Sequence, residues 1–136
     1  MQVLNLPADG TAAGAGMDDY ELRSHDGQVV VMIEFIGEPP HGDSYHSISV
    51  NGRKAPGYAW AGLFAFSDNS QYFVCNWMGH LYERRTIVID CSQYKYFVLP
   101  DYVSSFCVQW PRINSVQKGG EALSFEFTGE EKWSQF

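Results

Sequence analysis

Apolar and polar residues alternate over short segments of this chain, and no long window repeats apolar residues with the period of an α-helix. The clearest alternation is in 44–50, where Tyr45, Ser47 and Ser49 would face one side of an extended strand. The Asn51-Gly52 pair that follows is typical of a two-residue hairpin turn. Segments of similar character are 20–23, 28–36, 62–66, 71–77, 85–91, 95–99, 103–110, 113–117 and 122–128. The pattern therefore predicts an all-β protein of about ten strands.

The short turns between these segments predict antiparallel pairing of successive strands. We expect one four-stranded meander near 20–60 and a second near 62–110, with a final hairpin over 113–128 added to one sheet. Stacked face to face, the two meanders would form an antiparallel β-sandwich or a pair of propeller-blade-like sheets.

Two segments of the chain are alike and lie 43 residues apart, at 24–31 and 67–74. Each has a turn of Ser, Asp, Asn or Gly residues that leads into an apolar strand. The second, with Ser67-Asp68-Asn69-Ser70-Gln71 in its turn, resembles the Ser-Pro-Asp-Gly turn of TolB-like and WD40-like β-propeller blades. The resemblance covers about residues 20–110, or two blades, and implies a structural role for the turns. The proline of that turn is missing in both copies, and two blades cannot close a propeller ring.

The length of 136 residues predicts one domain, and 45% hydrophobic residues are enough for a single core. Residues 1–16 are rich in Gly and Ala from Ala8 onward, so we expect a flexible leader there and the domain at 17–136, although Val3 to Leu6 could add a short strand. No apolar run approaches the roughly 18 residues of a membrane-spanning helix.

The charge and the cysteines narrow the expected setting of the protein. A formal net charge of −7 argues against nucleic-acid binding, which needs clustered cations, and favours a basic protein partner. The three cysteines, Cys75, Cys91 and Cys107, lie in apolar runs without a C-x-x-C spacing. Three reduced, buried thiols fit a cytoplasmic location.

The sequence offers few groups for catalysis or metal binding. His41, Asp43 and His46 are the one local cluster with metal-ligating side chains, but an alternating strand would place the two imidazoles on opposite faces. We therefore interpret the cluster as a polar turn and expect no metal and no cofactor. Known nucleophile, phosphate-binding and zinc-protease motifs are missing from the sequence, so we expect no catalytic residues and no enzyme.

The segment 76–85 (NWMGHLYERR) carries the strongest sign of binding, because Trp, Tyr, Met and Arg are enriched at the centres of protein interfaces. Nearby loops could add Tyr58 and Tyr102. Inward packing of Trp77 and Tyr82 as core residues is an equal alternative. The predicted interaction residues are Trp60, Trp77, Met78, His80, Tyr82, Arg84 and Arg85.

These observations predict a non-enzymatic protein-interaction module, for example a neutralising protein of the immunity or antitoxin type. An open sheet edge would also permit a homodimer. The alternative from another class is a small-molecule-binding or hydrolytic β-fold with a pocket at Trp77, His80, Tyr82 and Trp110. A metal enzyme that uses His41, Asp43 and His46 is a third possibility.

Overall fold

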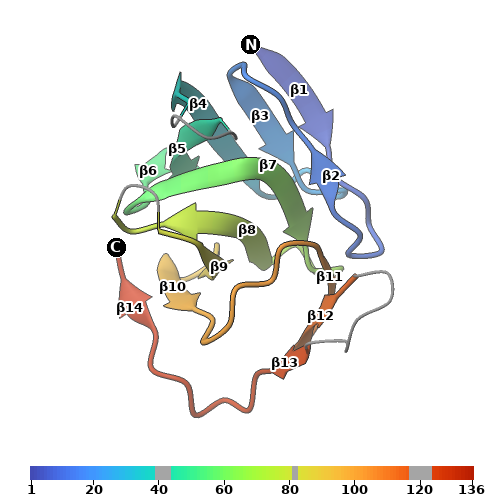
Figure 1. Cartoon of the computed structure of the whole chain (residues 1–136). Helices are drawn as coiled ribbons and strands as arrows, with labels where there is room; N and C mark the ends of the chain where they lie inside the picture. Colours follow the sequence, from blue (N-terminus) through green and yellow to red (C-terminus); the bar gives the residue numbers. More distant parts are fainter. Residues whose placement is uncertain (39–43, 81–82, 117–123) are drawn as a thin grey trace.

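The protein has an all-β fold, seen in a computed structural model that describes residues 1–38, 44–80, 83–116 and 124–136. These residues form fourteen strands in one large and one small sheet (Figure 1). The main path of the large sheet runs β1 (Gln2–Asn5), β3 (Tyr20–Arg23), β4 (Val30–Gly37), β5 (Tyr45–Val50), β7 (Tyr58–Phe66), β8 (Tyr72–Met78), β9 (Arg85–Asp90), β10 (Lys95–Val98) and β14 (Ser134–Gln135). Strand β2 (Ala13–Gly14) pairs with β7, and β6 (Arg53–Lys54) pairs with β5. The small sheet contains β11 (Phe106–Gln109), β12 (Arg112–Ser115) and β13 (Ser124–Glu126).

The all-β prediction is confirmed, but the strands are connected differently from two separate stacked meanders. Strand β5 pairs with β7, through Tyr45–Trp60 and His46–Ala59, so the two predicted meanders belong to one continuous sheet. The sheet is also mixed rather than purely antiparallel, because β1 runs parallel to β3. The final hairpin does not extend the large sheet. It pairs with β11 instead and forms the small second sheet.

The large sheet curls, so that strands far apart along it approach each other. Arg53, at the β5–β6 hairpin, places its guanidinium 4.2 Å from the centre of the Tyr94 ring between β9 and β10 and donates to the backbone oxygen of Phe136 at 3.3 Å. The concave face encloses a first core, to which β3, β4 and β5 contribute Leu22, Ile33 and Ile48.

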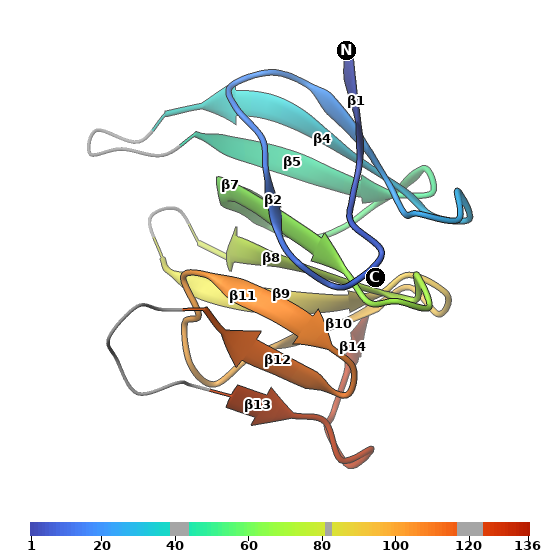
Figure 2. The same ribbon diagram turned by 90° about the vertical axis from the view of Figure 1, so that its right-hand side faces the viewer.

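A second core lies between the opposite face of β7–β9 and the small sheet (Figure 2). Its buried members are Ala65, Val74, Val88, Leu99, Val103, Phe106, Val108, Ile113 and Phe127. Neighbouring residues on one central strand therefore serve different cores: Cys75 belongs to the first and Val74 to the second. Both-sided burial explains why β8 and β9 are mostly apolar rather than alternating.

The two similar turns have the same hydrogen-bond pattern. Ser24 Oγ donates to Asp26 Oδ1 (2.8 Å) and accepts from the Val29 N–H (3.1 Å). In the second turn Ser67 Oγ donates to Asn69 Oδ1 (2.6 Å) and accepts from the Tyr72 N–H (3.0 Å).

The two turns also touch each other. Ser70 Oγ donates to Asp26 Oδ1 at 2.8 Å, and His25 Nε2 lies 2.6 Å from the carbonyl oxygen of Asp68. The likeness between the segments is thus a likeness of turns, and their contact links the β3–β4 and β7–β8 hairpins.

Residues 1–16, predicted to be a flexible leader, contain β1 and β2, which pair with β3 and β7 of the large sheet. The possible strand at Val3 to Leu6 corresponds to β1, Leu6 is 2% exposed, and the Gly10 carbonyl accepts from the Val108 N–H at 2.8 Å. A Cβ on Gly10 would lie 1.8 Å from the Val108 oxygen. The small residues permit close backbone packing, which composition alone does not distinguish from flexibility. In the described residues there is no helix with the length and apolar character needed to cross a membrane.

Candidate interaction surface

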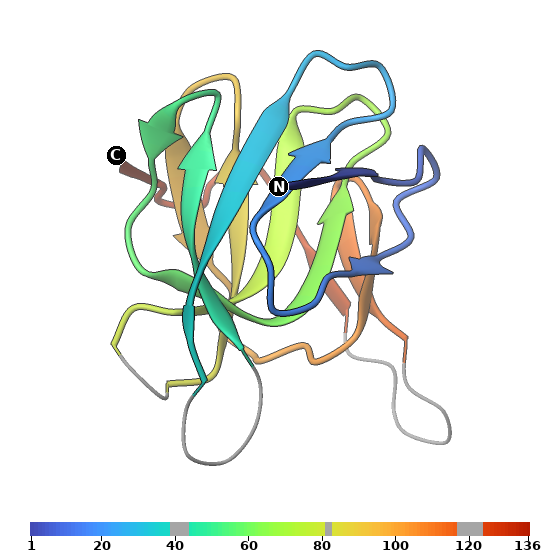
Figure 3. The ribbon, with the colours of Figure 1, turned by 90° about the horizontal axis from the view of Figure 1, so that it is seen from above.

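The connections between strands divide into two groups at opposite ends of the molecule (Figure 3). Short turns join β3 to β4, β7 to β8 and β9 to β10 at one end. At the other end β4, β8, β10 and β12 finish and β5, β9 and β13 begin. We call this second end the loop end. Because loops on a rigid sheet scaffold frequently carry binding residues, the loop end is the natural place to look for a site.

An aromatic and cationic stack is present at the loop end, built from three segments of the chain. Trp60 on β7 stacks on Tyr102 of the β10–β11 connection, with ring centres 6.0 Å apart and planes inclined by 20°. Arg84, just before β9, places its guanidinium carbon 5.0 Å from the centre of the Trp60 ring. The sequence predicted Trp60 and Arg84 as interaction residues and Tyr102 as a neighbour, and the structure brings these three together.

The exposure of the stack increases from Trp60 outward. Trp60 is only 6% exposed, Tyr102 is half-buried and Arg84 is exposed. The indole Nε1 of Trp60 is buried and has no hydrogen-bond acceptor among the described residues. A buried donor without a partner costs on the order of 1–3 kcal/mol. The buried Trp60 ring therefore supports the stack from below, and the Arg84 side chain forms the accessible surface of the stack.

Trp77 and Met78 are core residues, so their prediction as interaction residues is wrong. Trp77 is 8% exposed and Met78 is 1% exposed. The Trp77 indole packs in the first core and donates from Nε1 to the Pro56 carbonyl oxygen at 2.9 Å. The physical reason is that β8 is covered on both sides, so even its last residues are enclosed. The alternative interpretation of Trp77 as a core residue is the correct one.

Of the remaining predicted interaction residues, the structure describes His80 and Arg85. His80 and Arg85 are exposed, and Arg85 forms an ion pair with Glu83 at 2.5 Å. Tyr82 lies outside the described residues. Arg84 makes no ion pair within the described part of the chain, which leaves its charge available to another molecule.

The metal candidates do not come together in the described structure. His41 and Asp43 lie outside the described residues, and His46 is fully buried on β5. His46 Nε2 lies 2.9 Å from the Asp18 carbonyl oxygen, and its ring meets Phe35 edge-on. Burial lowers the pKa of His46. Among the described residues, no group of three or more His, Cys, Asp or Glu side chains is arranged to hold a metal ion.

The cysteines are free thiols with different accessibility. Cys75 and Cys91 are buried and Cys107 is half-buried. Burial raises the pKa of all three, most strongly for Cys75 and Cys91, so the thiolate form is disfavoured. Cys75 faces the first core, whereas His80 is exposed beyond the end of β8.

In the described part of the chain, Trp77 and Trp110 do not line a common pocket, as the alternative with His80 and Tyr82 required. Trp77 belongs to the first core, whereas Trp110 packs against the second, on the opposite face of the sheet. Trp110 stacks on Tyr72, with centres 3.4 Å apart, and on Phe127, with centres 4.7 Å apart. The sequence analysis missed this stack, because its members come from separate strands and no local pattern joins them.

A cleft of about 440 Å³ lies beside Trp110, but its charged groups already have partners. Asp90 accepts from the backbone and hydroxyl of Ser92, and Glu131 closes the turn at Thr128. The Lys95 ammonium lies over the ring of Trp133, which also lines the cleft. These carboxylates act as turn acceptors, so the cleft does not display the free convergent polar groups of a ligand site.

The comparisons with other proteins add no relative. No known family model matches the chain, and no match is found among curated proteins or solved structures.

Proposed function

We propose that this protein is a non-enzymatic interaction module that binds another protein through its loop end. The observation that carries the proposal is the stack of Arg84 on Trp60 and Trp60 on Tyr102. Tryptophan, tyrosine and arginine are the residue types most enriched at energetically dominant interface positions.

Preorganisation supports this role. An arginine side chain loses rotamer freedom when a partner fixes it, which costs on the order of 0.5–1.5 kcal/mol. Arg84 is already held over an indole ring that is 94% covered, since Trp60 is 6% exposed. A guanidinium on an aromatic face keeps its N–H donors free at the ring edge, where a partner carboxylate or carbonyl can accept them.

The charge distribution defines the partner further. Arg84 forms a local cationic spot on a chain whose net charge is −7, whereas the neighbouring Arg85 is paired with Glu83. The overall charge steers a basic protein toward the molecule, and the local spot fits a carboxylate or backbone carbonyl within the contact region. The proposed partner is therefore a basic protein that presents an acceptor group to Arg84.

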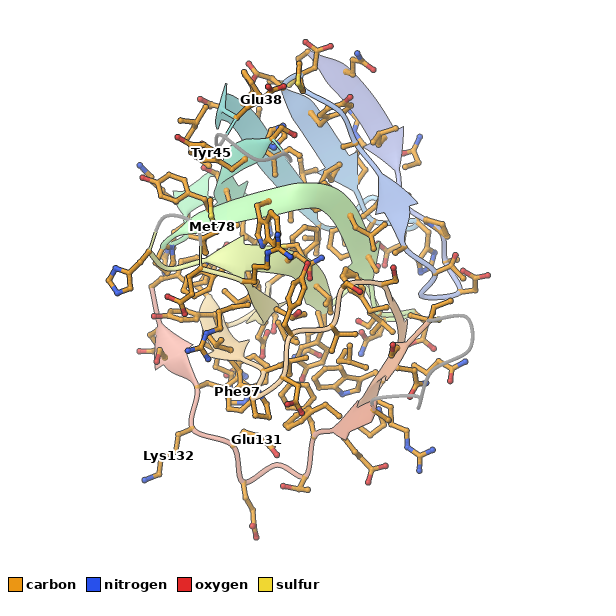
Figure 4. All side chains as sticks on the ribbon, viewed as in Figure 1. Glu38, Tyr45, Met78, Phe97, Glu131 and Lys132 are labelled. Carbon is orange, nitrogen blue, oxygen red and sulfur yellow. The ribbon has the colours of Figure 1, made fainter. Side chains whose placement is uncertain are left out.

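The test compares what Arg84→Ala and the wild type capture from the source cell extract, as measured by quantitative mass spectrometry. Lys132→Ala is the matched control, because Lys132 is also an exposed cation but lies on the β13–β14 connection. Figure 4 shows it away from Tyr45, the strand partner of Trp60, and from Met78, the last residue of β8. We expect a stoichiometric partner that the wild type and the control retain and Arg84→Ala loses, with the melting temperature unchanged. Equal capture by Arg84→Ala would exclude the loop end as the contact surface.

A further inference from the structure

We propose that β1 is a docking edge for an extended, basic segment of another protein, which adds to the large sheet as a further strand. This surface is separate from the loop end, and it does not depend on the function proposed above. It uses the backbone of β1 and the acidic and apolar side chains next to it.

The free edge follows from the ladder between β1 and β3. In this parallel pair the Gln2 N–H donates to the Asp19 carbonyl and the Leu6 N–H donates to the Arg23 carbonyl. Hydrogen bonding alternates along a parallel strand, so the N–H and C=O groups of Val3 and Asn5 point away from β3. Among the described residues β1 pairs only with β3, and it lies at the outer edge of the sheet (Figure 1).

β1 lacks two residue types that often protect an edge strand. Its sequence, QVLN, contains neither a lysine nor a proline. Natural edge strands often carry such residues, which discourage the pairing of another chain. Although β1 is only four residues long, its sequence therefore leaves the edge open to pairing, and strand addition is an established mode of peptide recognition.

Exposed apolar side chains are frequent in the N-terminal part of the chain. Within the described residues five large hydrophobic side chains are exposed, and four of them belong to the first 36 residues. They are Met1 (71% exposed), Val3 (48%), Met17 (58%) and Ile36 (46%). Val3 lies opposite Glu21 in the ladder, so its side chain shares a face of the sheet with that carboxylate.

Charge selects a basic segment over a second copy of the chain. Asp18, Asp19 and Glu21 lie next to β1, and Glu34 is on the following strand. The nearby cation, Arg23, is paired with Glu21 at 2.5 Å. Two copies that met through β1 would bring these carboxylates toward one another on chains of net charge −7 each, whereas lysine or arginine side chains on an added strand would be attracted to them across the width of β1.

The experiment measures binding of a blocked Lys-Val-Lys-Val-Lys-Val peptide, carrying a neutral dye, by fluorescence anisotropy. Amide hydrogen exchange, followed by NMR, locates the site. The comparison peptides replace either every lysine by glutamate or every valine by proline. We expect only the Lys-Val peptide to bind and to slow exchange at Val3 and Asn5. Raising the salt from about 50 mM to about 300 mM should weaken binding, because it shortens the screening length.

Variants of β1 test the strand geometry directly. Val3→Pro removes an outward N–H and leaves the ladder to β3 intact, so it should weaken binding roughly tenfold, or about 1.4 kcal/mol. Val3→Thr keeps the N–H and the branched side chain and should bind like the wild type, while Glu21→Gln should bind more weakly. Equal binding by Val3→Pro, or of the Lys-Pro peptide, would overturn the proposal. A concentration-dependent dimer that Val3→Pro abolishes would overturn it as well, since a second copy would then occupy the edge.

Discussion

The replacement of Trp77 by alanine tests whether this indole is a structural part of the first core. The side chain is 8% exposed, so the substitution removes almost the whole of a buried ring. Truncation of a buried aromatic residue costs about 3–5 kcal/mol, and loss of the hydrogen bond to the Pro56 carbonyl adds about 1 kcal/mol. The expected loss of about 4–6 kcal/mol is a large part of the roughly 5–15 kcal/mol typical of a whole domain.

Urea unfolding followed by circular dichroism measures the loss of unfolding free energy without relying on tryptophan fluorescence. Thermal unfolding is a second measurement: at a few degrees per kcal/mol, we expect the melting temperature to fall by about 10–20 °C. Trp77→Phe keeps a ring in the core and loses only the indole donor, so it should cost about 1–2 kcal/mol. A cost below about 1 kcal/mol for Trp77→Ala would refute the burial of this residue and return it to the candidate interaction surface.

Three further predictions concern the turns, the backbone and the thiols. Hydrogen bonds, first from the Gln28 N–H and then from two serine hydroxyls, lower the pKa of Asp26 from 3.8 to about 2. The ionised form stabilises the fold above its unfolded pKa, so unfolding curves should show a loss of stability as the pH falls from 4 toward 2, and Asp26→Asn should lack this component. Gly57→Ala should lower the melting temperature more than Gly27→Ala: both have positive φ (+69° and +72°), but only at Gly57 would the new Cβ meet an indole, 2.4 Å away. Equal shifts would contradict that contact. In the native protein a thiol reagent should label Cys107 before Cys75, as mass spectrometry of partial labelling would show; the reverse order would contradict their burial.

The strands were predictable where the chain carries local signals. The alternation in β5 and the Asn51-Gly52 turn after it mark a strand end and a hairpin from sequence alone. The pairing of β5 with β7 and the parallel pairing of β1 with β3 join segments whose contact depends on the curl of the sheet. No period in the sequence encodes that curl, so the sequence predicted the all-β, sandwich-like fold but divided the large sheet into two separate meanders.

The candidate site was predictable only in part, for a related reason. Trp60 and Arg84 were identified by residue type, and the structure places them in contact. Trp77 and Met78 have the same interface character but are buried, because β8 is covered by a core on each side. When both faces of a strand are apolar, the sequence loses the alternation that separates inward from outward residues. The edge of β1 was obscured by the small residues around it, which suggested flexibility.

The shared central strands make the two cores thermodynamically dependent on each other. Val74 and Cys75 are consecutive residues that anchor opposite layers, so removal of either layer exposes the backs of the same strands to water. Neither half can retain its own enclosed interior after the other has melted. The whole molecule should therefore lose its structure in one cooperative step, and the slowest amide exchange should occur along β8.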